Sequence, residues 1–113
     1  MIGLNQSEAA QAWAEYLTRK GHKVEQKVEF LISRNTCRER LYWLVFSSAR
    51  ARKAFRGAEL SCIRNLLSRC QRSGGSAYVV VCFTRPERKF VAASAEYVLE
   101  NKELQADKGG VFL

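Results

Sequence analysis

Histidine and paired cysteines, which are common in metal and redox sites, are scarce in this sequence. The single histidine, His22, follows a helix stop at Gly21 and has no partner nearby in the sequence, so we interpret it as structural rather than as a ligand or general base. The cysteines form no C-x-x-C pair and stand in no secretory context, which argues against a zinc site or a disulfide framework. We expect all four to be small buried residues: Cys37, Cys62, Cys70 and Cys82.

Long apolar runs are also missing. No stretch approaches the roughly 18 residues needed to span a bilayer, and the N-terminus lacks the basic-then-apolar layout of a signal peptide. We therefore expect a soluble, cytoplasmic protein with no membrane partner. No repeat or low-complexity linker divides the chain, and 113 residues with 47% hydrophobic content suit one core. This predicts a single domain over residues 1–113, with residues 106–113 as a short C-terminal tail.

Acidic residues are few, and the resulting positive charge is concentrated in the middle of the chain. Nineteen Lys and Arg against eleven Asp and Glu give a net charge of +8 and a pI near 9.7. The segment from Arg34 to Lys89 holds thirteen basic and three acidic residues, so it carries +10 and the remainder carries −2. Eleven of those thirteen are arginine, whose planar fork suits bidentate phosphate contact. The pattern predicts a polyanionic partner, by default nucleic acid.

Hydrophobic periodicity predicts three helices and four strands. The helices are expected over residues 5–20, opening with a capping-box-like Asn5 and Glu8, over 58–72, and over 95–105. The strands are expected over residues 23–32, 41–46, 77–83 and, at a sheet edge, 89–93. The run at 77–83 is apolar on both faces, which is typical of a strand covered by helices on both sides. The order α-β-β-α-β-β-α predicts an α/β (α+β) protein with a central mixed sheet flanked by helices.

This order resembles that of the PD-(D/E)XK nuclease superfamily, in particular the archaeal Holliday-junction resolvases. The segment SEAAQAWAEYLTRKGHKV is similar to the opening helix, VEFLI to the strand with the catalytic Asp, RLYWLVFSSA to the E-x-K strand, and LLSRCQRSGGSAYVVVCF to the closing helix and strand. The resemblance covers about residues 7–92. It implies a restriction-endonuclease-like fold, a DNA partner and a homodimer.

The catalytic positions of that family are only partly filled here. Glu8 stands where the opening helix often supplies an acid, and Glu29 where the first metal-binding Asp is expected. Val45 and Ser47 stand at the Glu and Lys of E-x-K. The chemistry needs carboxylate oxygens around Mg²⁺ and a lysine that orients water, so the resemblance implies a vestigial site. The only aspartate, Asp107, falls in the tail, where this fold places no metal ligand.

An E-x-K does occur one strand earlier, at Glu25 and Lys27, with Glu29 two residues further on. Side chains two apart on a strand share a face, so these three residues could form a shifted metal site. Alternating charge on a strand is more often only its solvent side.

The predicted nucleic-acid surface combines the two basic loops that flank the strand at 41–46. We expect phosphate contacts from seven residues in these loops: Arg34, Arg38 and Arg40 before the strand, and Arg50, Arg52, Lys53 and Arg56 after it. Phe55 lies among them, and it is expected either to anchor the loop to the core or to stack on a base.

Three functions remain open. The first is a non-catalytic protein without a cofactor that binds nucleic acid through its phosphates. The second is a Mg²⁺-dependent endonuclease or Holliday-junction resolvase with an altered site at Glu8, Glu25, Lys27 and Glu29. The third is an interaction module that docks an acidic protein partner. A homodimer could form through the apolar cluster at Tyr42, Trp43 and Phe46, although burial within one chain would explain the same residues.

Overall fold

The computed structural model describes residues 6–85, 88–106 and 111–112. In chain order its elements are α1 (Gln6–Arg19), β1 (Lys23–Gln26), β2 (Leu31–Arg34), β3 (Arg40–Ser48), β4 (Arg52–Ala54), α2 (Gly57–Ser73), β5 (Ser76–Phe83), β6 (Lys89–Ser94), α3 (Ala95–Asn101), β7 (Glu103–Gln105) and β8 (Val111–Phe112). Within these ranges no helix has the length and apolar character needed to cross a membrane.

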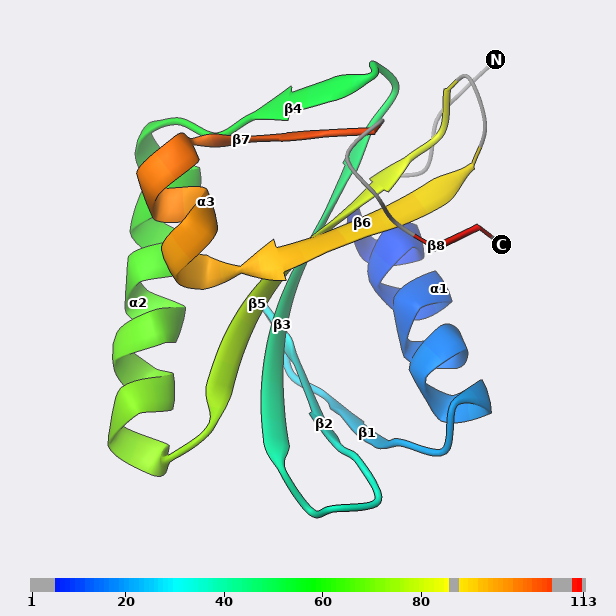
Figure 1. The fold of residues 1–113 in the computed structure, drawn as a ribbon, viewed down its shortest axis with the longest axis vertical. Helices are drawn as coiled ribbons and strands as arrows, with labels where there is room; N and C mark the ends of the chain where they lie inside the picture. Colours follow the sequence, from blue (N-terminus) through cyan, green and yellow to red (C-terminus); the bar gives the residue numbers. More distant parts are fainter. Residues whose placement is uncertain (1–5, 86–87, 107–110, 113) are drawn as a thin grey trace.

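Six strands form one mixed sheet in the order β1-β2-β3-β5-β6-β8 (Figure 1). β3 and β5 run parallel, and every other pair in the sheet is antiparallel. Parallel neighbours need a long crossover, which here contains α2. β4 and β7 pair with each other in a separate two-stranded sheet. The predicted α/β class, with a mixed central sheet flanked by helices, is confirmed.

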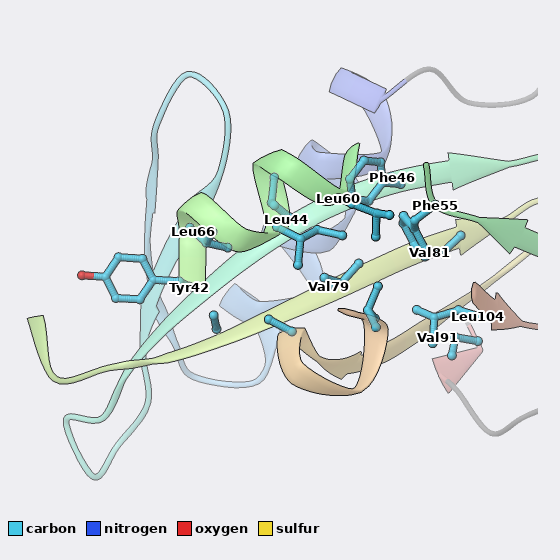
Figure 2. Packing of buried hydrophobic residues seen from close by; sticks show 14 of the residues in the cluster. Tyr42, Leu44, Phe46, Phe55, Leu60, Leu66, Val79, Val81, Val91 and Leu104 are labelled. Carbon is cyan, nitrogen blue, oxygen red and sulfur yellow. The ribbon is translucent and has the colours of Figure 1, made fainter. Parts of the chain in front are cut away.

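Helices cover both faces of the sheet (Figure 1). α1 covers one face, where Trp13 makes edge-on ring contacts with Trp43 and Phe90, at centroid distances of 5.2 and 4.9 Å. α2 and α3 cover the other face, where Val79 and Val81 join a cluster of buried apolar side chains (Figure 2). β5 is therefore buried on both sides, as its apolar run predicts.

α2 follows directly from its sequence pattern. Leu60, Ile63, Leu66 and Cys70 recur at helical spacing and are its buried residues. The helix ends at Gly74, whose φ of 80° is a left-handed conformation that favours glycine and whose N–H donates to the Cys70 carbonyl at 2.9 Å. The predicted helix over 58–72 is thus confirmed, with one residue added at each end.

The predicted single strand over residues 23–32 is wrong, because the chain turns back within it. The Lys27 N–H donates to the Phe30 carbonyl at 2.8 Å, which closes a tight turn between β1 and β2. The two halves then pair antiparallel, with Glu25 opposite Ile32. The alternation of the segment fits either arrangement, since both halves keep a period of two.

The predicted last helix over 95–105 is too long. α3 ends after Asn101, where Lys102 takes a left-handed φ of 62°, and Glu103–Gln105 then forms β7. β7 pairs with β4, a partner some fifty residues earlier that local periodicity does not reveal. β6 is also not a free edge where it begins, because Lys89 and Phe90 pair with β8.

Parts of several predictions lie outside the described residues. They are Asn5 of the capping box and Asp107 with most of the C-terminal tail.

Candidate nucleic-acid interface

β3 lies between the two basic loops and carries the vestigial positions Val45 and Ser47. β2 pairs only with its first half, and the last pair is Leu31 with Trp43. On that side, the described residues place no strand beside Val45 and Ser47. The open edge forms part of a groove of about 560 Å³ that also involves the start of α1, the β1–β2 turn and the start of α2.

The groove collects some of the residues at the vestigial catalytic positions. Glu29 and Val45 line it, as does Lys27 of the shifted E-x-K, whereas Glu8, Glu25 and Ser47 are not among its lining residues. Val45 is buried against α1 in the core, and Ser47 is half-buried opposite Cys82 of β5. Within the described ranges, no three His, Cys, Asp or Glu side chains converge on a point that could hold a metal ion.

The shifted E-x-K residues do not lie together on one strand, because β1 ends at Gln26. Glu25 lies on β1, whereas Lys27 and Glu29 lie in the turn, so the three do not share one strand face. Lys27 forms an ion pair with Glu25 at 2.8 Å. The hydrogen bond and charge of Lys27 hold the pKa of Glu25 below its ordinary value, with smaller contributions from Arg34 and Arg40.

Lys53, in the basic loop after β3, is held by the fold. Its Nζ forms an ion pair with Glu59 at 2.7 Å and lies 5.7 and 5.4 Å from the ring centroids of Phe46 and Phe55. Glu59 in turn accepts a hydrogen bond from the Arg56 N–H at 3.4 Å, at the start of α2. Lys53 therefore fixes the loop to the first turn of α2, and its charge is already balanced.

The other three cations of this loop differ in their partners. Arg52 lies on β4 and forms an ion pair with Glu103 of β7 at 3.6 Å. Arg50 and Arg56 are exposed, and neither forms an ion pair within the described part of the chain. These two arginines are the cations of this loop best placed to meet an external anion.

The basic hairpin before β3 is shaped by Asn35. The Asn35 Oδ1 accepts hydrogen bonds from the N–H groups of Cys37 and Glu39, at 3.0 and 3.1 Å. Arg38 takes a left-handed φ of 62°, which is uncommon in a non-glycine residue and occurs here within the turn. Arg34 and Arg38 are exposed and Arg40 is half-buried, and their side chains form no ion pair among the described residues.

The two basic loops lie at opposite ends of β3, so the seven predicted residues do not form one compact patch. β3 separates them, and Arg40 and Ser48 at its ends are about 26 Å apart at the usual rise per strand residue. Figure 1 shows the β2–β3 hairpin at one end of the molecule and β4 at the other. A strand of nine residues is long enough to keep its flanking loops apart.

The aromatic residues near these loops are part of the core. Phe55 is buried and contacts Phe46 edge-on at a centroid distance of 5.1 Å, which agrees with the expected core anchor. Tyr42, Trp43 and Phe46 are also buried within this chain, so they are not available as a dimer surface.

The structure also tests the predictions for His22 and the four cysteines. His22 Nδ1 lies 3.2 Å from the buried hydroxyl of Ser33, in keeping with a structural role. All four cysteines are free: Cys70 and Cys82 are buried, which raises the pKa of each thiol. Cys37 and Cys62 are exposed, so the expectation that all four are buried is wrong for these two.

Three further cations lie outside the two basic loops and were not singled out from the sequence. Arg69 and Arg72 project from the last turns of α2 and line a second groove of about 490 Å³ together with Phe30. Lys23 lies on β1 directly opposite Arg34. The helical wheel of α2 places both arginines on its polar side, but only the sheet register reveals Lys23.

No protein-family model matches this chain, and no curated protein matches it. Among solved structures, it is similar to that of Archaeoglobus fulgidus Hjc, a Holliday junction resolvase from an archaeal hyperthermophile, with a TM-score of 0.62 and 15% sequence identity. The likeness covers 80% of this chain and 73% of the resolvase chain. At this identity it shows the fold alone, so this chain has a resolvase-like, nuclease-type fold.

Proposed function

We propose that this protein binds nucleic acid, in the first place DNA, through the phosphate backbone and does not cleave it. The observation that carries the proposal is the set of exposed arginines without ion pairs on a resolvase-like fold, among them Arg34, Arg50 and Arg56. Backbone contact depends on charge and shape and needs no metal. Arginine-to-phosphate contacts position a protein on nucleic acid and carry little sequence information, so we expect little sequence preference.

The absence of cleavage is proposed from the residues of β3. A hydrolytic metal site of this kind needs carboxylates that converge on the metal and a lysine that orients the attacking water. β3 carries no carboxylate, and Val45 is packed into the core where the resemblance expects the Glu. The alternative endonuclease would have to use Glu29 together with Glu59, which lines the same groove but is paired with Lys53 at 2.7 Å.

The direct test is fluorescence anisotropy on duplex, single-stranded and four-way-junction DNA. The double variant Arg50→Gln/Arg56→Gln should bind several-fold more weakly than the wild type on every sequence, because each phosphate contact contributes without reading bases. The matched control removes two cations from the end of α1, on the other face of the sheet, as Arg19→Gln/Lys20→Gln. The control should bind as the wild type does.

Incubation of the same DNAs with Mg²⁺ or Mn²⁺ tests the second half of the proposal. We expect intact DNA at enzyme excess, and specific cleavage that is lost in Glu29→Gln would establish the endonuclease alternative. Binding of polyglutamate with no binding of any nucleic acid would establish the acidic-partner alternative.

A further inference from the structure

The sheet register places three cations in one row at the hairpin end of the molecule. Lys23 of β1 lies opposite Arg34 of β2, and Arg34 lies opposite Arg40 of β3. Side chains directly opposite on neighbouring strands point to the same face and have their Cβ atoms about 4.5–5.5 Å apart. We call these three residues the cation row.

A row of like charges at this spacing opposes folding, because opposite residues of the same sign repel each other. No ion pair within the described ranges relieves it: the one acid on the adjoining row, Glu25, is already paired with Lys27 at 2.8 Å. The charges of Arg34 and Arg40 nevertheless reach that carboxylate and contribute to its lowered pKa. The positive charge of the cation row thus acts on the Glu25 carboxylate, but no ion pair among the described residues neutralises it.

The end of α2 adds two more cations on the same face. Ser73 Oγ lies 2.8 Å from the hydroxyl of Tyr42, which is two residues along β3 from Arg40 and on the same side of the strand. The guanidinium of Arg69 stacks over the Phe30 ring at 5.3 Å. Phe30 in turn lies 6.0 Å from the ring of Tyr42.

A groove runs beside α2 on this face, and the residues of the cation row are not among those that line it. Arg69 and Arg72 line it on the side of α2, Phe30 and Glu29 line it on the side of the β1–β2 turn, and Leu44 contributes to its surface. Stacking on Phe30 fixes the plane of the Arg69 guanidinium. Arg72 belongs to the exposed side of the helix.

We propose that the cation row, together with Arg69 and Arg72, is a second phosphate-binding site, so that the protein holds nucleic acid at both ends of α2. This rests on the proposed function and specifies its geometry. Arg56 and Arg72 mark the two ends of α2 and are about 24 Å apart along the helix axis, at 1.5 Å per residue. That distance corresponds to about 7 base pairs of duplex at 3.4 Å each. The preferred ligand is therefore a duplex long enough to reach both ends.

The test compares hairpin duplexes with stems of 6 and 16 base pairs. The wild type should bind the long stem at least tenfold more tightly than the short one after correction for the number of sites, because the second contact is intramolecular. The variant Arg34→Gln/Arg40→Gln should lose this preference, and its salt slope on the long stem should fall by about 2. The variant Arg19→Gln/Lys20→Gln, with the same charge change, should keep both.

Thermal melting of the free protein distinguishes a phosphate-binding site from a set of cations that only stabilises the fold. Removal of two charges from the cation row should raise the melting temperature of the free protein at low salt, and the rise should shrink as salt screens the row. A variant that keeps the wild-type length preference and slope, or that melts earlier than the wild type when free, overturns the second site. In that case normal wild-type binding to both stems leaves the proposed function intact, whereas no binding to either stem refutes the proposed function itself. Binding of polyglutamate that is lost in Arg34→Gln/Arg40→Gln, with no binding of either stem, assigns the surface to an acidic protein and also overturns the site.

Discussion

Lys53 and Arg50 stand three residues apart in the same basic loop, yet we expect opposite consequences when each loses its charge. Lys53 is 21% exposed in its side chain, is ion-paired to Glu59 and lies beside two aromatic rings. The substitution Lys53→Met keeps much of the apolar stem and removes the ammonium group. It therefore isolates the ion pair and the cation–π contacts.

The magnitude follows from these contacts. A partly exposed ion pair contributes up to about 1 kcal/mol after solvent screening, and exposed cation–π contacts contribute roughly 0.5–1 kcal/mol. We expect Lys53→Met to lower the free energy of unfolding by about 1–2 kcal/mol, measured by urea denaturation followed through Trp fluorescence. DNA affinity and its salt slope should stay at the wild-type values, because the Lys53 charge is already neutralised by Glu59.

Arg50→Gln is the matched comparison. Arg50 is exposed and forms no ion pair within the described ranges, so its loss should change stability by less than about 0.5 kcal/mol. Its salt slope should fall by about 1, as for one lost phosphate contact. The division into structural and binding cations would be refuted if Lys53→Met flattened the slope as much as Arg50→Gln does and left the urea midpoint unchanged.

Three further predictions concern the stability of the fold and the pKa of Glu25. Ser33→Ala removes the buried acceptor 2.8 Å from Trp43 Nε1 and should cost about 1–3 kcal/mol in urea denaturation; a loss under about 0.5 kcal/mol would contradict it. Lys27→Gln should raise the pKa of Glu25 more than Arg34→Gln does, in an NMR titration, and equal effects would speak against the ion pair. Because that pKa is depressed in the folded protein, the contribution of Glu25 to stability is present near neutral pH and is lost as the pH falls through the folded pKa. Gly75→Ala would place a Cβ 2.7 Å from the Arg40 carbonyl oxygen and should cost about 1–3 kcal/mol in thermal unfolding, which an unchanged midpoint would disprove.

The elements that the sequence predicts well are those whose signal is local and unambiguous. α2 repeats apolar residues at helical spacing and ends at Gly74, and β5 is a continuous apolar run, so both could be located from the sequence. The β1–β2 turn could not, because residues 23–32 alternate as one strand would and contain no glycine or proline. β7 could not either, since it exists by pairing with β4, far away in the sequence.

In the candidate site, too, the composition can be predicted from the sequence but the long-range arrangement cannot. The excess of arginine in the middle of the chain is visible in the sequence, but its arrangement is not. Arg40 and Arg50 appear as neighbours across one strand, and the length of β3 holds them at opposite ends of the molecule. Conversely, Lys23 and Arg40 are seventeen positions apart and become members of one row through the register of three strands.

The salt dependence of DNA binding by the wild-type protein tests the central claim most directly. Contact with about four to seven phosphates predicts that log K falls with log salt at a slope of roughly −4 to −6 for duplex DNA, by counterion release. The measurement is a fluorescence-anisotropy titration of a 16-base-pair stem at several salt concentrations. A slope in that range supports a phosphate-binding surface, and affinity weaker than micromolar even at low salt, or a slope near zero, would contradict it.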